Sequence, residues 1–131
     1  MIPDDLQHLD ASKIAARHTI DFTTRQSLID LVLARAAVLG IAPEALAAKL
    51  AAKAMVLFQE ETETVNPSEV IANWTAKANA HAGADTPWSF VTHRPLVMKL
   101  RLTACEFDLT TSAMANLLLA KGFEHHTEQG I

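Results

Sequence analysis

The sequence predicts an all-α fold: a compact bundle of about five helices, with or without one short N-terminal strand, ending in a helix-turn-helix-like corner. The length of 131 residues corresponds to a single domain over 1–131. Half of the residues are apolar and a fifth are charged, which is the composition of a chain that folds. Alanine, the strongest helix former, dominates the apolar fraction, and tyrosine is absent.

The best-marked helix of the N-terminal half covers residues 24–39. Thr23 and Gln26 fit a capping box at its start, and Gly40 ends it in a left-handed conformation. Its apolar residues occupy most of its circumference, so it is buried on more than one side, in the core or in an oligomer interface. We therefore expect self-association through residues 24–39.

The other elements follow from the same kinds of signal. Asn66-Pro-Ser-Glu69 is the clearest helix start, because it combines an Asn cap, a first-turn proline and an acidic third residue. Residues 82–95 contain glycine and proline breakers around Trp88 and predict an ordered loop anchored by aromatics. The predicted elements are a helix over 11–17, a weak strand over 18–22, helices over 43–61, 67–80, 95–107 and 111–121, and frayed ends over 1–9 and 124–131.

One segment, residues 102–123, has the residue types that two helices crossing at a tight turn require. Ala104 is the small residue at the crossing, and Asp108 tolerates the positive φ of the turn. Leu109 is the buried residue of the turn, and Thr110 or Thr111 caps the second helix. Met114 and Leu117 or Leu118 then face inward, and Lys121-Gly122 ends the helix. This segment resembles the helix-turn-helix class in general.

The resemblance implies a small DNA-binding transcriptional regulator, with palindromic sites calling for a homodimer. The second helix would present to the bases the residues Thr111, Ser112, Ala115 and Asn116. The phosphates would be contacted by Arg94, Lys99, Arg101, Thr110 and Lys121. An ordinary αα-corner without a ligand has the same shape, and this second helix carries no Arg or Lys before its last turn.

The charge distribution favours a different class, a helical protein-interaction module such as an adaptor, an inhibitor or an antitoxin-like partner. The formal net charge is −4, whereas nucleic-acid-binding domains are usually basic. The excess acid lies in the central stretch 54–85, where Lys77 is the only base. In this class the contact surface would be the acidic segment 60–69 or the loop around Trp88.

Two weaker patterns also permit DNA binding. Ala36, Gly40, Ile41 and Leu46 repeat the helix-turn-helix offsets, although a glycine-stopped helix before a proline-started one explains them equally well. A strand at 18–22 followed by two helices also has the order of ribbon-helix-helix repressors, which read DNA with the strand. The outward residues of that strand would be His18, Thr19, Asp21 and Thr23.

No catalytic, cofactor or metal-binding motif is present, so we expect neither an enzyme nor a bound cofactor. The glycines are scattered rather than gathered in a phosphate loop. Cys105 has no partner for an internal disulfide and is expected to be a buried, inert thiol. The histidines are expected to be exposed. No signal peptide or long apolar span is found in the sequence, so the expected location is the cytoplasm, with no membrane contact.

Overall fold

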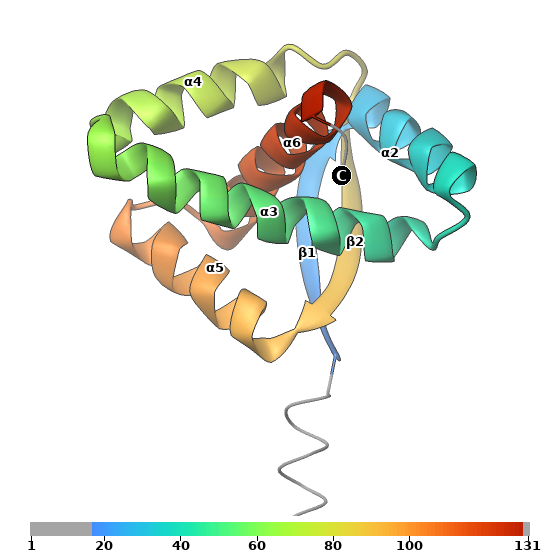
Figure 1. The fold of residues 1–131 in the computed structure, drawn as a ribbon, viewed down its shortest axis with the longest axis horizontal. Coiled ribbons are helices and arrows are strands. Elements are labelled where there is room, and N and C mark those ends of the chain that lie inside the picture. The colour runs from blue at the N-terminus through green and yellow to red at the C-terminus, as the bar shows by residue number, and fades with distance from the viewer. Residues whose placement is uncertain (1–16, 130–131) are drawn as a thin grey trace, which may run out of the picture.

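The computed structural model describes residues 17–129 and shows a mostly helical fold with a two-stranded antiparallel sheet (Figure 1). The elements are β1 (Arg17–Arg25), α2 (Gln26–Leu39), α3 (Pro43–Thr64), α4 (Pro67–Asn79), β2 (Asp85–His93), α5 (Arg94–Glu106) and α6 (Thr111–Gln129). The expected frayed segment 1–9 and the expected helix over 11–17 lie outside the described residues, except that Arg17 begins β1.

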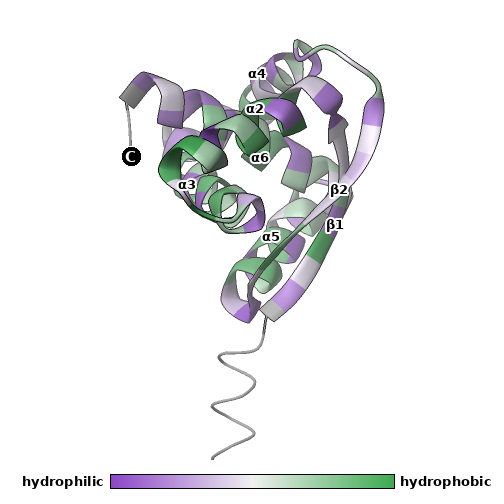
Figure 2. Ribbon diagram, turned by 90° about the vertical axis from the view of Figure 1, so that its right-hand side faces the viewer, coloured by the Kyte–Doolittle hydropathy of each residue, from purple (hydrophilic) through white to green (hydrophobic). Residues whose placement is uncertain are grey.

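The sheet is a long ribbon in which β1 pairs with β2 from Arg17 opposite His93 to Arg25 opposite Asp85. All the helices lie on one side of it (Figure 2). Ile20, Phe22 and Phe90 are buried on the helix-covered face, while alternate residues of β1 are exposed. The strands are far apart in the sequence, because α2, α3 and α4 lie between them.

The prediction of a loop over residues 82–95 is wrong, because residues 85–93 form β2. Pro87 is tolerated for a geometric reason. Its partner Thr23 points its backbone N–H away from β2, to Ser112 Oγ at 3.1 Å. Thr23 and Pro87 are therefore a pair without ladder hydrogen bonds, where proline's missing N–H costs nothing.

The helix starts agree better with the sequence than the helix ends do, although α2 begins at Gln26 without a side-chain cap, so the capping box predicted at Thr23 is wrong. Asn66 caps α4 by accepting a hydrogen bond from the backbone N–H of Ser68 at 2.9 Å, and Gly40 ends α2 with φ of 69°. Gly122 does not end α6, which continues to Gln129, so the frayed end expected from residue 124 is wrong. Gly122 is needed for close packing instead, because a Cβ there would collide with the backbone carbonyl of Leu50 on α3.

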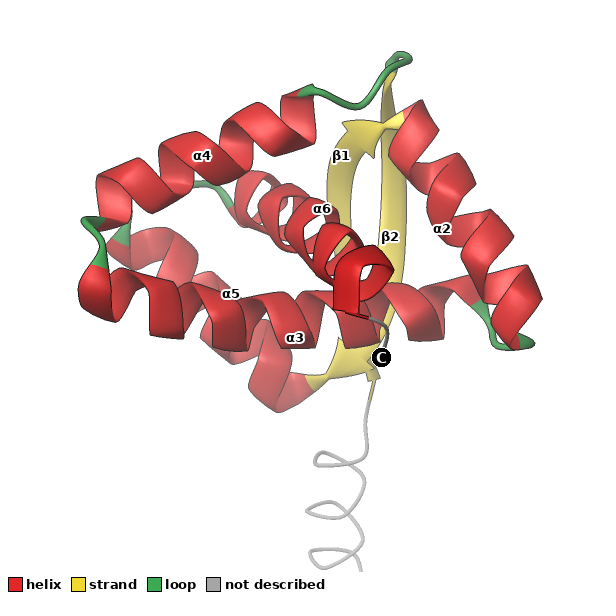
Figure 3. Cartoon of the chain, turned by 45° about the horizontal axis from the view of Figure 1, so that its top comes forward, coloured by secondary structure: helices red, strands yellow, loops and turns green. Residues whose placement is uncertain are grey.

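α6 is the central helix of the fold. It packs against α3, α4, α5 and β1, and Figure 3 shows it running between α3 and α4 in front of the ribbon. Met114, Ala115 and residues 117–120 are buried. The other helices form a shell around α6 and the inner face of the ribbon.

Candidate functional site

The turn between α5 and α6 has the local geometry expected of a helix-turn-helix corner. Ala104 is buried at the crossing, and Asp108 has φ of 58°. The backbone N–H of Leu109 donates to the carbonyl oxygen of Ala104 at 2.8 Å. The Thr110 hydroxyl caps α6 by accepting from the N–H of Ala113 at 3.0 Å.

The surroundings of α6 differ from those of a helix that reads DNA. Ala115 is buried, so in this structure it cannot reach a base. Ser112 is half-buried and accepts a hydrogen bond from β1, and Thr111 is also half-buried. The side-chain oxygen of Asn116 is buried, with no hydrogen-bond partner among the described residues. The prediction that Ala115 faces bases is therefore wrong, because α6 packs against α3, α4, α5 and β1.

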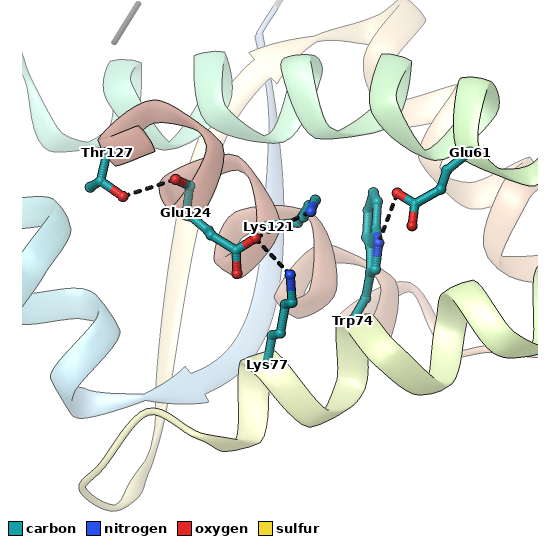
Figure 4. A network of polar contacts seen from close by, with 6 residues as sticks. All are labelled: Glu61, Trp74, Lys77, Lys121, Glu124 and Thr127. Atoms are coloured by element: carbon teal, nitrogen blue, oxygen red, sulfur yellow. Dashed lines mark hydrogen bonds and ion pairs between the residues drawn. The ribbon is translucent and has the colours of Figure 1, made fainter. Parts of the chain in front are cut away.

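Lys121, which we expected to meet a phosphate, belongs to a partly exposed polar network within the fold (Figure 4). Its ammonium lies 3.2 Å from Glu124, which also pairs with Lys77 at 2.8 Å. It also lies 5.6 Å from the centre of the Trp74 ring, whose N–H donates to Glu61 at 3.3 Å. The network joins α6 to α3 and α4.

The charges of this network stabilise one another. Partial burial alone would raise the pKa of Glu124, but hydrogen bonds from Lys77 and Lys121 outweigh burial and lower it. The hydrogen bond to Glu124 in turn raises the pKa of Lys77. We therefore assign Lys121 a structural part. Of the other predicted phosphate contacts, Thr110 also has one, as the cap of α6.

Those other contacts lie on or next to α5 and are accessible. Arg94, Lys99 and Arg101 are exposed, and among the described side chains none of them forms a salt bridge. Thr110 is also exposed. Positive charge is thus available on α5, at three of the residues predicted to meet phosphates.

The most apolar exposed surface belongs to α2. Leu28, Ile29, Val32 and Ala36 are buried on its inner side. Within the described range α2 also carries half of the large apolar residues that are exposed: Leu31, Leu33, Val38 and Leu39, with Val38 74% exposed. Asp30, the acid of α2, accepts a hydrogen bond from Gln26 at 2.9 Å. We call this exposed surface the outer face of α2.

A shallow depression of about 480 Å³ lies on the ribbon. It is lined by Asp21, Phe22, Thr23, Pro87, Trp88, Ser89 and Ser112. Trp88 is half-buried, with its ring 6.1 Å from that of Phe22, so it is anchored in β2 rather than carried by a loop. Asp21 is the only carboxylate of the lining, which contains no histidine, lysine or cysteine.

Two titratable residues differ from expectation. Cys105 is exposed rather than buried. His126 is buried, and its Nε2 accepts a hydrogen bond from Arg35 Nε on α2 at 2.8 Å. Burial, followed by the charges of Arg35 and His125, lowers the pKa of His126. Within residues 17–129, no three His, Cys, Asp or Glu side chains converge as metal ligands would.

Comparison of the chain with protein families, with characterised proteins and with solved structures finds no significant match. In the described part of the chain no single helix is long and apolar enough to cross a bilayer; α2 and α3 together satisfy that criterion by length and composition, but they are bent by 107° relative to each other.

Proposed function

We propose that this protein is a helical protein-interaction module without catalytic activity, in the manner of an adaptor, an inhibitor or an antitoxin-like partner. Its main contact surface is the outer face of α2. The observation that carries the proposal is the concentration of exposed apolar side chains on this one helix. Exposed apolar side chains that adjoin one another, as Leu31 and Val38 do by their spacing of seven residues, typically mark a protein contact.

The spacing of the outer face suits a second helix. Leu31, Ala34 and Val38 are spaced by three and four residues, so they form one row along α2, and all three are exposed. An amphipathic helix of a partner protein would pack its apolar face along this row. Complete burial of a leucine or valine side chain is worth about 1.5–3 kcal/mol. Self-association through residues 24–39 is the case in which that helix is α2 of a second copy.

A double substitution tests the outer face. Leu31→Gln/Val38→Gln removes two apolar side chains without touching the inner side of α2, and Met98→Gln/Leu102→Gln is the matched control on α5. We expect a partner purified with the wild-type protein from its native host to be retained by the control and lost from the α2 variant. Equal retention by both variants, or a wild-type protein with no partner and no self-association, would overturn the proposal.

A second candidate function is DNA-binding regulation, favoured by the three exposed cations of α5. Arg94, Lys99 and Arg101 carry positive charge on a protein whose net charge is negative. Because α6 is enclosed, the DNA contact would run along α5 and the exposed Thr110, and it would be made to phosphates rather than to bases. This contact is electrostatic and therefore sensitive to salt.

Retention of DNA fragments as a function of salt tests this second candidate. We expect the wild-type protein to show a steep logarithmic salt dependence, and Arg94→Glu/Arg101→Glu to lose retention. Arg25→Glu, which reverses a charge on the ribbon, is the control. Absence of wild-type retention at low salt would remove this candidate and leave the interaction module untouched.

A further inference from the structure

One row of exposed residues on α3 carries two bases followed by two acids. Lys49, Lys53, Val56, Glu60 and Glu63 are all exposed. Their spacing of four, three, four and three residues places them on one side of the helix. α3 crosses the front of the molecule in Figure 1. We call this row the α3 stripe.

The charges of the α3 stripe are segregated about its centre. Both bases precede Val56, and both acids follow it. Val56 itself is 43% exposed. None of the four charged residues takes part in a salt bridge or a side-chain hydrogen bond within the described chain. The stripe therefore presents two unpaired blocks of opposite charge on either side of an apolar residue.

The pattern is complementary to itself when the helix is turned end to end. With a two-fold axis at Val56, Lys53 of one copy lies opposite Glu60 of the other, and Lys49 lies opposite Glu63. At a rise of about 1.5 Å per residue, the paired positions lie at nearly equal distances from the axis. The two Val56 side chains meet at the centre. We propose that the α3 stripe is the interface of an antiparallel homodimer, held by these four reciprocal ion pairs around Val56.

The α3 helix dipole favours a second copy over a solvated stripe. Acidic residues are unfavourable near a helix C-terminus, yet Glu63 lies in the last turn of α3, which contains no base. An antiparallel copy brings its Lys49 to that end. The neighbouring exposed residues on the flank, Ala52 and Gln59, are uncharged and bring no repulsion. An unrelated partner would need an acidic block and a basic block at the matching positions by coincidence, whereas a two-fold copy supplies both by symmetry.

The dimer extends the proposed function. It rests on that function only in that both describe a protein that acts through contacts with other protein chains. α2 and α3 are bent by 107° relative to each other, so they have different directions in the fold. A dimer joined through α3 would therefore display two outer faces of α2. Its test and the test of the α2 surface use different residues, so either can fail alone.

Charge reversal measured by sedimentation velocity tests the dimer. Lys53→Glu alone and Glu60→Lys alone each replace two attractive contacts with repulsive ones, and we expect dimerisation to weaken about tenfold. The double variant Lys53→Glu/Glu60→Lys restores both pairs in reversed sense, so its dimer is expected to be within about threefold of the wild type. Glu106→Lys, at an exposed residue of α5, is the control and leaves dimerisation unchanged.

Mixing two variants gives the second arm of the experiment. Lys49→Glu/Lys53→Glu has an all-acidic stripe, and Glu60→Lys/Glu63→Lys has an all-basic one. Each alone is expected to be monomeric, and an equal mixture is expected to form a 1:1 heterodimer that high salt weakens. A monomeric wild type, a double variant as weak as its single variants, or a dimer lost only in Leu31→Gln/Val38→Gln would each overturn the proposal.

Discussion

α6 and α2 are both rich in alanine and leucine, but they occupy opposite situations in the fold. α6 is enclosed by α3, α4, α5 and β1, and residues 117–120 are buried without interruption. α2 buries one side and leaves the other in solvent. The difference comes from what surrounds each helix, and not from how apolar it is. An apolar helix in the sequence is therefore a core helix or a contact helix, and stability measurements separate the two.

The largest contrast is expected from truncating one leucine in each helix. Leu118→Ala in α6 removes a fully buried side chain and leaves a cavity, which should lower the free energy of unfolding by about 2–5 kcal/mol. Leu33→Ala in α2 removes a side chain that is 41% exposed and should cost less than about 1 kcal/mol. Urea unfolding measures both. Equal losses would mean that α2 is covered in solution.

A pair of glycine substitutions gives the next effect. Gly122→Ala drives a methyl group against the backbone of Leu50, and the expected loss is about 1–3 kcal/mol or a failure to fold. Gly40→Ala meets no atom within 4 Å, but it takes a φ of 69° and should lose about 1 kcal/mol. Thermal unfolding compares them. A neutral Gly122→Ala would contradict the tight α6–α3 crossing.

The contact between Arg35 on α2 and His126 on α6 makes stability depend on pH. Neutral His126 accepts from Arg35, and a protonated imidazole has no acceptor to offer. Because its folded pKa lies below the unfolded value of 6.5, stability is complete above pH 6.5 and declines as the pH falls towards the folded pKa. His81, whose pKa burial also lowers, acts in the same direction.

The check is the midpoint of thermal unfolding across this pH range for three proteins. His126→Gln keeps an acceptor for Arg35 and should show a shallower decline below pH 6.5 than the wild type. His125→Gln removes only the smallest of the three contributions to the lowered pKa of His126, so its curve should lie close to that of the wild type. If the three curves coincide, His126 is not held neutral between α2 and α6.

The smallest effect is expected from the ion pairs around α6. Lys77→Ala removes the 2.8 Å contact to Glu124, but the Lys77 side chain is 48% exposed. The loss should be about 0–1 kcal/mol in urea unfolding and smaller at high salt. A loss comparable to that of Leu118→Ala would mean that charge, rather than apolar burial, holds α6 in place.

Local signals in the sequence predicted the helices well because they act over a few residues. The Asn66 cap, the proline at position 43 and the turn at Asp108 all lie where the sequence places them. The same signals misled at positions where tertiary packing, rather than a turn or a helix end, explains a glycine or a proline. Gly122 is a packing residue within α6, and Pro87 sits at the one kind of ladder position that tolerates it.

The candidate site was harder to predict, because accessibility is decided by distant neighbours. The pattern over 102–123 identified the corner residues Ala104 and Asp108. It could not show that Ser112 lies against β1, or that Lys121 pairs with Glu124. The sequence contains the two bases and two acids of the α3 stripe on either side of Val56, but only the exposure of all its members shows that these charges face solvent in the fold.

The separation of the two strands has a kinetic consequence. Residues 26–84 connect the two strands, and the two ends of this connection lie side by side. There the N–H of Gln26 donates to Ala84 O at 3.0 Å, and the N–H of Ser27 donates to Ala82 O at 3.1 Å. Closing so long a loop costs entropy before any strand contact repays it. The ribbon should thus assemble after the helices between its strands, so that Ile20→Val accelerates unfolding far more than it slows refolding.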